Sequence, residues 1–194
     1  MSRVLSAQKL TDSRFLNLYE MQVEQRGGKQ SIYHVASRAK DATKLKAISG
    51  ENKPDAVAIC AFVGAEAPEK LVLIRQYRFP VGGYIYELPA GLVENGESVL
   101  TTAIREMFEE TGMEFIPNGD ANVNRPFFSS PGMTDESISL VMGRCTGTPT
   151  NENQEDSEDI QVVLADKAEC LRILSEESVD VRAAYMIMLF LSWN

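Results

Sequence analysis

Three glutamates near the middle of the chain are spaced so that a helix would bring their carboxylates together. Glu106, Glu109 and Glu110 lie at positions i, i+3 and i+4 of a stretch that lacks Gly and Pro, and such positions share one helix face. Like charges crowded there destabilise a bare helix, and Arg105 can pair with Glu109 but cannot neutralise all three. Mg²⁺ binds carboxylate and carbonyl oxygens together with substrate phosphates. The cluster lies beside the loop Pro89-Ala90-Gly91, which has a free carbonyl, and is therefore a candidate Mg²⁺ platform; the alternative is a solvated acidic face.

The helix that must position these carboxylates has local start and stop signals. Ser98 is a suitable N-cap, and Gly112 can end the helix in a left-handed conformation. Between them Val99, Ala103 and Met107 recur at helical spacing. We therefore expect a helix from Ser98 to Gly112 with one apolar face.

The rest of the chain alternates short β-rich segments with turns and ends in two helical segments. A Gly-Gly turn at residues 26–29 predicts an N-terminal hairpin. The segments predict an α+β fold in which a mixed β-sheet is flanked by helices, with residues 1–45 as an N-terminal β element and 46–194 as the main domain. Strands are expected at 15–23, 31–38, 56–63, 71–74, 84–88, 138–142 and 160–164, and helices at 166–175 and 180–193.

Composition excludes several classes of protein. The 194 residues carry a net charge of -9, which disfavours nucleic acid as the main partner. His34 is the only histidine, so catalytic triads and metal sites built on several histidines are excluded. No apolar run approaches the roughly 18–20 residues that span a bilayer, and no signal peptide is evident. We expect a cytoplasmic protein with no membrane partner. Its three cysteines, Cys60, Cys145 and Cys170, have no paired spacing and are expected to be buried free thiols.

The segment around the glutamates matches a known motif. Residues 91–113, GLVENGESVLTTAIREMFEETGM, resemble the Nudix box GX5EX7REUXEEXGU, in which U is apolar, at every specified position. This match favours the metal platform over a solvated acidic face. The resemblance implies a Nudix fold, with the mixed sheet sandwiched between helices and the box forming a loop–helix–loop. It also implies that Glu106, Glu109, Glu110 and the Ala90 carbonyl hold Mg²⁺, or Mn²⁺ in its place, while Glu97 braces the loop.

Segments before the box resemble the ADP-ribose pyrophosphatase branch of this family. Residues 75–84, RQYRFPVGGY, and 87–91, ELPAG, are similar to the QxR and ExPAG segments of that branch. The planar guanidinium of Arg78 suits paired phosphate oxygens, so Arg78 is expected at the diphosphate, with Arg75 as a second candidate. The alternative for Arg78 is a surface ion pair with Glu87 or with the acidic loop.

A segment after the box resembles the same branch. Residues 129–136, SSPGMTDE, are similar to a loop that lines the sugar side of the pocket in these enzymes and in GDP-mannose pyrophosphatases. Gly132 and Met133 are therefore expected at the substrate, and Glu136 could accept hydrogen bonds from ribose hydroxyls. The alternative is that SSPG is simply a turn.

The acidic loop before the last strand is expected to supply the general base, because the helix glutamates are used as metal ligands. Residues 155–160, EDSEDI, are similar to an acidic segment of the branch that activates water and can add a metal ligand. Glu158 fits both roles, and Asp156 or Glu155 are the alternative bases. A merely solvated loop is also possible on this pattern.

The N-terminal hairpin also matches the branch, in which this element pairs with a second subunit. The resemblance therefore implies a homodimer, with Arg38, Tyr33 and Tyr19 as candidates for phosphate or base contacts. Core packing is the default for an aromatic side chain on a strand.

These observations predict a Mg²⁺-dependent hydrolase of nucleoside-diphosphate sugars, with ADP-ribose, cleaved to AMP and ribose 5-phosphate, as the leading substrate. GDP-mannose or another sugar nucleotide is the alternative. A nucleoside-triphosphate or dinucleoside-polyphosphate hydrolase fits the flanking segments less well. A non-catalytic nucleotide-binding module is disfavoured by the complete box.

Overall fold

The computed structural model describes residues 1–119, 124–154 and 159–193, and its contacts divide the chain into two compact units. The first comprises residues 1–55 with 126–138, and the second comprises residues 56–125 with 139–194. The segment 126–138, which the sequence assigned to the main domain, packs with the N-terminal element. For example, the Ala36 amide donates to the Met133 carbonyl at 2.9 Å.

The first unit is built on a three-stranded antiparallel sheet in the order β1-β2-β3. The predicted hairpin is confirmed, and Gly28 adopts a φ of 81° in its turn. Strand β1 was not predicted, because a β-bulge between Val4 and Ser6 interrupts its alternation. One sheet face buries Tyr19, whose side chain is fully enclosed. The elements of this unit are β1 (Arg3–Lys9), β2 (Asn17–Glu24), β3 (Gln30–Ser37), the short helices η1 (Ala42–Lys44) and α1 (Lys46–Ser49), and β9 (Pro126–Phe128).

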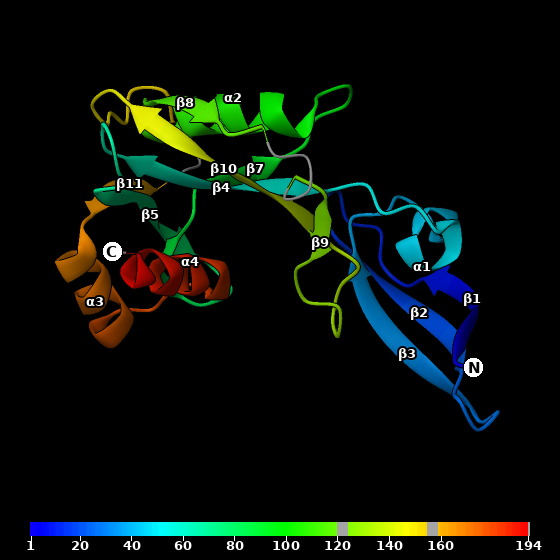
Figure 1. The fold of residues 1–194 in the computed structure, drawn as a ribbon. Helices are drawn as coiled ribbons and strands as arrows, with labels where there is room; N and C mark the ends of the chain where they lie inside the picture. The colour runs from blue at the N-terminus through cyan, green and yellow to red at the C-terminus, as the bar shows by residue number, and fades with distance from the viewer. Residues whose placement is uncertain (120–123, 155–158, 194) are drawn as a thin grey trace. The chain divides into compact units, whose positions relative to one another are not determined.

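The second unit contains most of a larger sheet with the strand order β11-β5-β4-β10-β8, to which β6 adds beside β5 and β7 beside β4. Strands β4 and β10 run in the same direction in Figure 1, whereas β4 and β5 are antiparallel, so the sheet is mixed. Its strands are β4 (Ala56–Val63), β5 (Lys70–Arg78), β6 (Gly83–Glu87), β7 (Ala90–Leu92), β8 (Glu114–Pro117), β10 (Ser137–Thr146) and β11 (Ile160–Ala165); its helices are α2 (Val99–Thr111), α3 (Lys167–Glu176) and α4 (Val181–Ser192).

Helices cover both faces of this sheet. Helix α2 packs on β4, β7 and β8, whereas α3 contacts β11 and α4 contacts β5 and β6. Figure 1 shows α2 on one side of the sheet and α3 with α4 on the other. The predicted α+β architecture with a sheet between helices is therefore confirmed. The core beneath α2 includes Ala103 and Met107 from the helix, packed against Val57, Ile59 and Val72 of the sheet.

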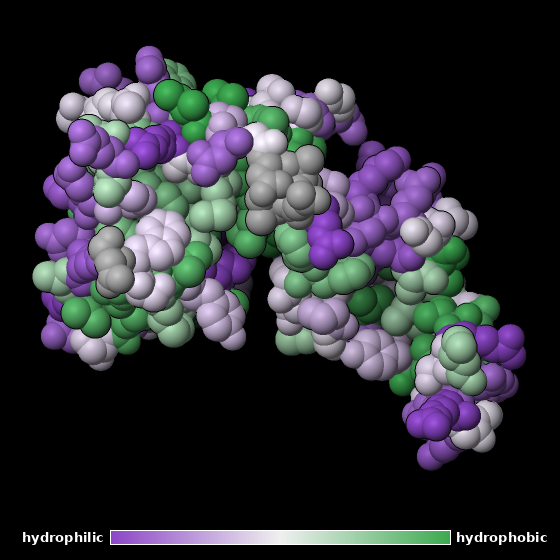
Figure 2. All heavy atoms as spheres, viewed as in Figure 1, coloured by the Kyte–Doolittle hydropathy of each residue, from purple (hydrophilic) through white to green (hydrophobic). Residues whose placement is uncertain are grey.

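Helix α2 begins and ends where the sequence predicts. The Ser98 hydroxyl accepts a hydrogen bond from the Thr101 amide at 3.1 Å, and Gly112 closes the helix with a φ of 69°. Apolar side chains also reach the surface over α2 and β8 (Figure 2), where Ile104 and Phe108 are exposed.

Two further expectations can be compared with the structure. Strand β5 continues to Arg78, past the predicted end at residue 74, because its polar half pairs with β6. The three cysteines are free and buried, as predicted, and burial raises the pKa of each thiol. Among the described residues, no helix is long and apolar enough to cross a membrane.

Candidate active site

The carboxylate of Glu106 lies directly against the backbone of Gly91. A Cβ atom added to Gly91 would lie 1.8 Å from Glu106 Cδ, which is far inside van der Waals contact. Gly91 belongs to β7 and pairs with Val57 of β4. Because Gly91 has no side chain, the Glu106 carboxylate can lie against its backbone. The pairing of β7 with β4 fixes the position of that backbone.

Glu110 is attached to the same loop. Its side chain is 3% exposed, and its Oε2 accepts a hydrogen bond from the Ala90 amide at 3.0 Å. Helix α2 thus brings Glu106 and Glu110 to adjacent residues of β7, next to the Ala90 carbonyl that is predicted to bind the metal.

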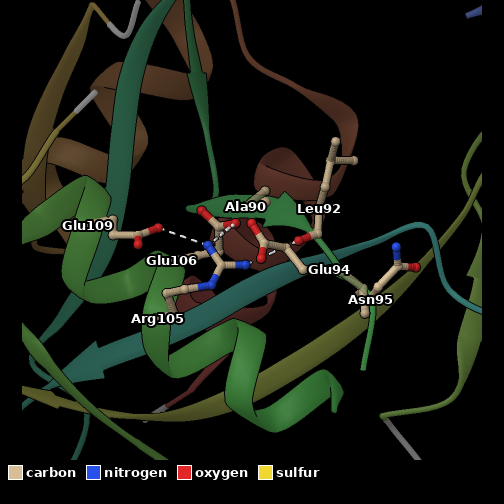
Figure 3. Close-up of a pocket in the computed structure, with 9 residues that line it drawn as sticks. Ala90, Leu92, Glu94, Asn95, Arg105, Glu106 and Glu109 are labelled. Atoms are coloured by element: carbon tan, nitrogen blue, oxygen red, sulfur yellow. Dashed lines mark hydrogen bonds and ion pairs between the residues drawn. The ribbon is translucent and has the colours of Figure 1, made fainter. Parts of the chain in front are cut away.

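Arg105 links the remaining acidic groups of the box. Its Nη1 donates to Glu106 Oε1 and to Glu109 Oε2, both at 2.8 Å, so the expected pairing with Glu109 is confirmed. Its Nε and Nη2 donate to the two oxygens of Glu97 at 3.0 and 2.9 Å. The same guanidinium holds the pKa of Glu97 at about 2, mainly through these hydrogen bonds. Figure 3 shows Arg105 between Glu106 and Glu109, with its guanidinium turned toward the Leu92 carbonyl.

Arg105, Glu106 and Glu109 border a cavity of about 680 Å³, whereas Glu97 and Glu110 are not part of its lining. Sequence reasoning did not select Glu94 and Asn95, which also line it, because the box leaves their positions unspecified. The full lining consists of Ala90, Gly91, Leu92, Val93, Glu94, Asn95, Arg105, Glu106 and Glu109.

The donor set of this cavity suits a hard divalent cation. Carboxylate and carbonyl oxygens are the ligands that Mg²⁺ prefers, and the space against Gly91 already accommodates the Glu106 carboxylate beside Ala90. Within the described ranges, however, no three Asp, Glu, His or Cys side chains converge as a metal cluster, and Arg105 holds oxygens of Glu106 and Glu109. The residues fit Mg²⁺ in chemistry, and the ligand assignment stays a prediction.

Arg78 is paired within the protein. Its guanidinium binds the buried Glu87 through Nε at 2.9 Å and Nη2 at 2.5 Å, which raises the pKa of Arg78. This is the ion pair that the sequence left open as the alternative. Arg75 instead lies 4.4 Å over the ring of Tyr84 and donates to Gln161 at 3.3 Å. Contact of either arginine with phosphate stays a prediction.

The other predicted substrate residues gather within the first unit. Arg38 pairs with Glu136 at 3.2 Å, and the Tyr33 hydroxyl donates to the Gly132 carbonyl at 2.6 Å. Met133 follows in the same loop and is 72% exposed. Tyr19 is fully buried and its hydroxyl donates to the Ala39 carbonyl, so Tyr19 is a core residue and not a base-stacking one.

The predicted general bases Asp156, Glu158 and Glu155 lie outside the described residues. The described residue before them, Gln154, donates to the Glu110 carbonyl at 2.7 Å, near the C-terminal end of α2. No local pattern in the sequence could indicate that contact.

Comparisons with known proteins show the family to which the chain is similar. Residues 52–184 match the NUDIX domain family. A nudix hydrolase of Caenorhabditis elegans is 37% identical over 123 residues, which are 61% of this chain and 54% of the relative, so the chain spans about half the length of that protein. The ADP-ribose pyrophosphatase of Bacillus subtilis is 25% identical over 187 residues, covering 95% of this chain and 90% of the relative.

A solved structure shares the fold. A crystal structure described as an ADP compounds hydrolase superposes with a TM-score of 0.69 at 18% identity, covering 99% of this chain and 93% of the other. Since the family match extends over more than half of the sequence, this chain belongs to the NUDIX domain family.

Proposed function

We propose that this protein hydrolyses the diphosphate bond of a nucleoside-diphosphate sugar with Mg²⁺, and that ADP-ribose, cleaved to AMP and ribose 5-phosphate, is its substrate. The observation that carries the proposal is that two carboxylates of the box contact adjacent residues of β7. Glu106 lies against Gly91, and Glu110 accepts a hydrogen bond from the Ala90 amide. The choice of substrate is supported by the Bacillus subtilis relative, which carries the name ADP-ribose pyrophosphatase and aligns with nearly the whole chain.

Glu106, Glu109, Glu110 and the Ala90 carbonyl would hold Mg²⁺ or Mn²⁺, with Glu158 as a further candidate ligand. When bound, the ion supplies charge neutralisation for the non-bridging phosphate oxygens. The ion pair of Arg105 with Glu97 would hold the loop of the box against helix α2. A carboxylate from the acidic loop, Asp156 or Glu158, would take the proton of the attacking water.

Arg38, Gly132, Met133 and Glu136 of the first unit keep their predicted role as substrate-binding residues in this proposal. Arg38 pairs with Glu136, which belongs to the same loop as Gly132 and Met133, and the Met133 carbonyl accepts from the Ala36 amide. The strands of the first unit expose Leu5, Leu18 and Ile32. These apolar side chains support a homodimer in which this element pairs with a second subunit. Buried free thiols fit a cytoplasmic location.

A substrate panel tests the proposal. The purified full chain is incubated with Mg²⁺ and, separately, ADP-ribose, ADP-glucose, GDP-mannose, dATP and diadenosine tetraphosphate, and the products are separated by anion-exchange chromatography. We expect AMP and ribose 5-phosphate from ADP-ribose, no turnover after chelation, and recovery on adding Mg²⁺. Absence of turnover of every sugar nucleotide by folded protein would reject the proposal. A preference for GDP-mannose would change the proposed substrate and leave the proposed reaction unchanged.

A further inference from the structure

The C-terminal end of α2 is held by a segment that is remote in sequence. The last four carbonyl groups of a helix have no hydrogen-bond partner within it. In α2 the Thr111 carbonyl accepts a hydrogen bond from the Thr150 amide at 2.9 Å, and the Glu110 carbonyl accepts one from Gln154 Nε2 at 2.7 Å. Both donors belong to the segment 147–154, which lies with α2 in the second unit. Tertiary contacts therefore satisfy two of the open carbonyls.

The last glycine of the box allows this segment to approach the helix closely. Gly112 ends α2 with a φ of 69°, and a Cβ atom added there would lie far inside van der Waals contact with Thr150 Cγ2. The backbone nitrogen and oxygen of Thr150 also lie 3.2 Å from that position. The Gln154 amide in turn donates to the Asn151 carbonyl at 3.3 Å. The side chain of Gln154 is thus presented by backbone that is itself attached to the end of the helix.

The charge of the last turn explains why such donors are needed. The backbone dipoles give the C-terminus of a helix a partial negative charge, so a carboxylate there is unfavourable. The last turn of α2 contains Glu109 and Glu110 and no basic residue. Arg105, one turn earlier, pairs with Glu109. Donors from outside the helix therefore stabilise the turn that carries two of the predicted metal ligands.

Glu110 is held at both its side chain and its main chain. Its carboxylate accepts a hydrogen bond from the Ala90 amide at 3.0 Å, and its carbonyl accepts the one from Gln154. Without the Gln154 donor the last turn of α2 can shift relative to β7. A shift of about 1 Å is enough to disturb a reacting assembly. The contact with Gln154 therefore bears on the position of the Glu110 carboxylate as well as on the stability of the helix.

We propose that Gln154 is a positioning residue for the predicted metal site. By donating to the Glu110 carbonyl, its side-chain amide fixes the last turn of α2 and with it the Glu110 carboxylate beside Ala90. The inference rests on the proposed function and adds to it a residue outside the box, 44 positions away from Glu110. Gln154 contacts neither the substrate nor the metal ion and acts through Glu110.

The test replaces Gln154 with Met, which has similar length and no N–H donor, and measures metal binding as well as turnover. The probe is Mn²⁺, whose binding to the purified full chain is followed by electron paramagnetic resonance without substrate. We expect Gln154→Met to weaken Mn²⁺ binding by roughly 3- to 10-fold, the change that loss of one neutral hydrogen bond produces. Turnover of ADP-ribose at sub-saturating Mg²⁺ should fall by a similar factor and recover as Mg²⁺ is raised. The KM for ADP-ribose at saturating Mg²⁺ should stay unchanged.

Unchanged Mn²⁺ affinity would overturn the inference even if turnover falls, because the effect would then not pass through the metal site. A double variant tests the link to Glu110 directly. In a Glu110→Gln background, Gln154→Met should weaken Mn²⁺ binding no further, since the residue that Gln154 positions is already altered. An additive loss would reject the link.

Controls separate positioning from a general loss of structure. Asn153→Ala removes the exposed amide side chain next to Gln154 and should leave Mn²⁺ affinity unchanged. Gln154→Leu also lacks the donor and should show the same loss as Gln154→Met, so the test does not depend on one variant folding. Thermal unfolding of each variant identifies those that are folded at the assay temperature. If the wild type binds Mn²⁺ but hydrolyses no sugar nucleotide, the proposed reaction fails and the affinities still decide the inference on Gln154.

Discussion

Replacing Gly91 with Ala tests whether the position of the Glu106 carboxylate controls activity. The new methyl group would lie 1.8 Å from Glu106 Cδ, and ordinary contact begins at 3.4 Å, so the carboxyl carbon must move by about 1.6 Å. Gly91 does not have a positive φ, so Ala adds no backbone strain. The obstacle is the end of a flexible side chain, which can turn aside. We therefore expect the free energy of unfolding to change by less than about 1 kcal/mol.

Activity should respond far more strongly, because a misplacement of about 1 Å in a reacting assembly can cost roughly 100-fold in rate. We expect Gly91→Ala to lower kcat/KM for ADP-ribose by at least about that factor. The assay follows release of AMP at several Mg²⁺ concentrations, alongside thermal unfolding. Gly27→Ala is the matched control, since no atom lies within 4 Å of its Cβ and its φ is not positive. Full activity of Gly91→Ala would refute the claim that the position of the Glu106 carboxylate controls activity. A loss of activity caused by unfolding would refute the claim that the flexible Glu106 side chain can turn aside at little cost in stability.

Three more outcomes are expected. Glu106→Gln and Glu110→Gln should each remove most activity at unchanged helix content by circular dichroism; near-normal rates in both would contradict the metal assignment. The pKa of Glu97 lies at about 2 instead of its ordinary 4.5, so its stabilising effect is complete above pH 4.5 and is lost toward pH 2. The difference in Tm between wild type and Glu97→Gln should shrink between about pH 6 and pH 3, and a constant difference would count against the pairing. Asp156→Asn and Glu158→Gln compared by kcat identify the base, and two unaffected rates would exclude the loop from catalysis.

Elements whose ends are determined locally were predictable from sequence. Helix α2 is bounded by Ser98 and Gly112, and each acts on backbone groups within a few residues of itself. Strand ends depend instead on a partner that is remote in sequence. The polar half of β5 is extended because Tyr77 pairs with Tyr84 on β6. The short strand β8 exists because Phe115 pairs with Cys145 on β10.

The same distinction applies to the site. The box could be recognised because its positions lie on one helix and one adjoining loop. Gln154 and Glu94 were not identified, because their contacts with the site are made only after folding. Gln154 reaches the Glu110 carbonyl across 44 positions in the chain.

The charges around the predicted site residues support the proposal that a divalent cation acts on this chain, whose net charge is -9. The expected phosphate-binding arginines are already engaged by carboxylates, Arg78 by Glu87 and Arg38 by Glu136. Arg105 is shared among three glutamates. A guanidinium whose charge is offset in this way orients a diphosphate well but neutralises it weakly. Arg75, which contacts the neutral side chains of Tyr84 and Gln161, keeps more of its charge for a ligand. The arginines would thus mainly set the direction of the substrate, while neutralisation of the developing charge falls to Mg²⁺ held by the box.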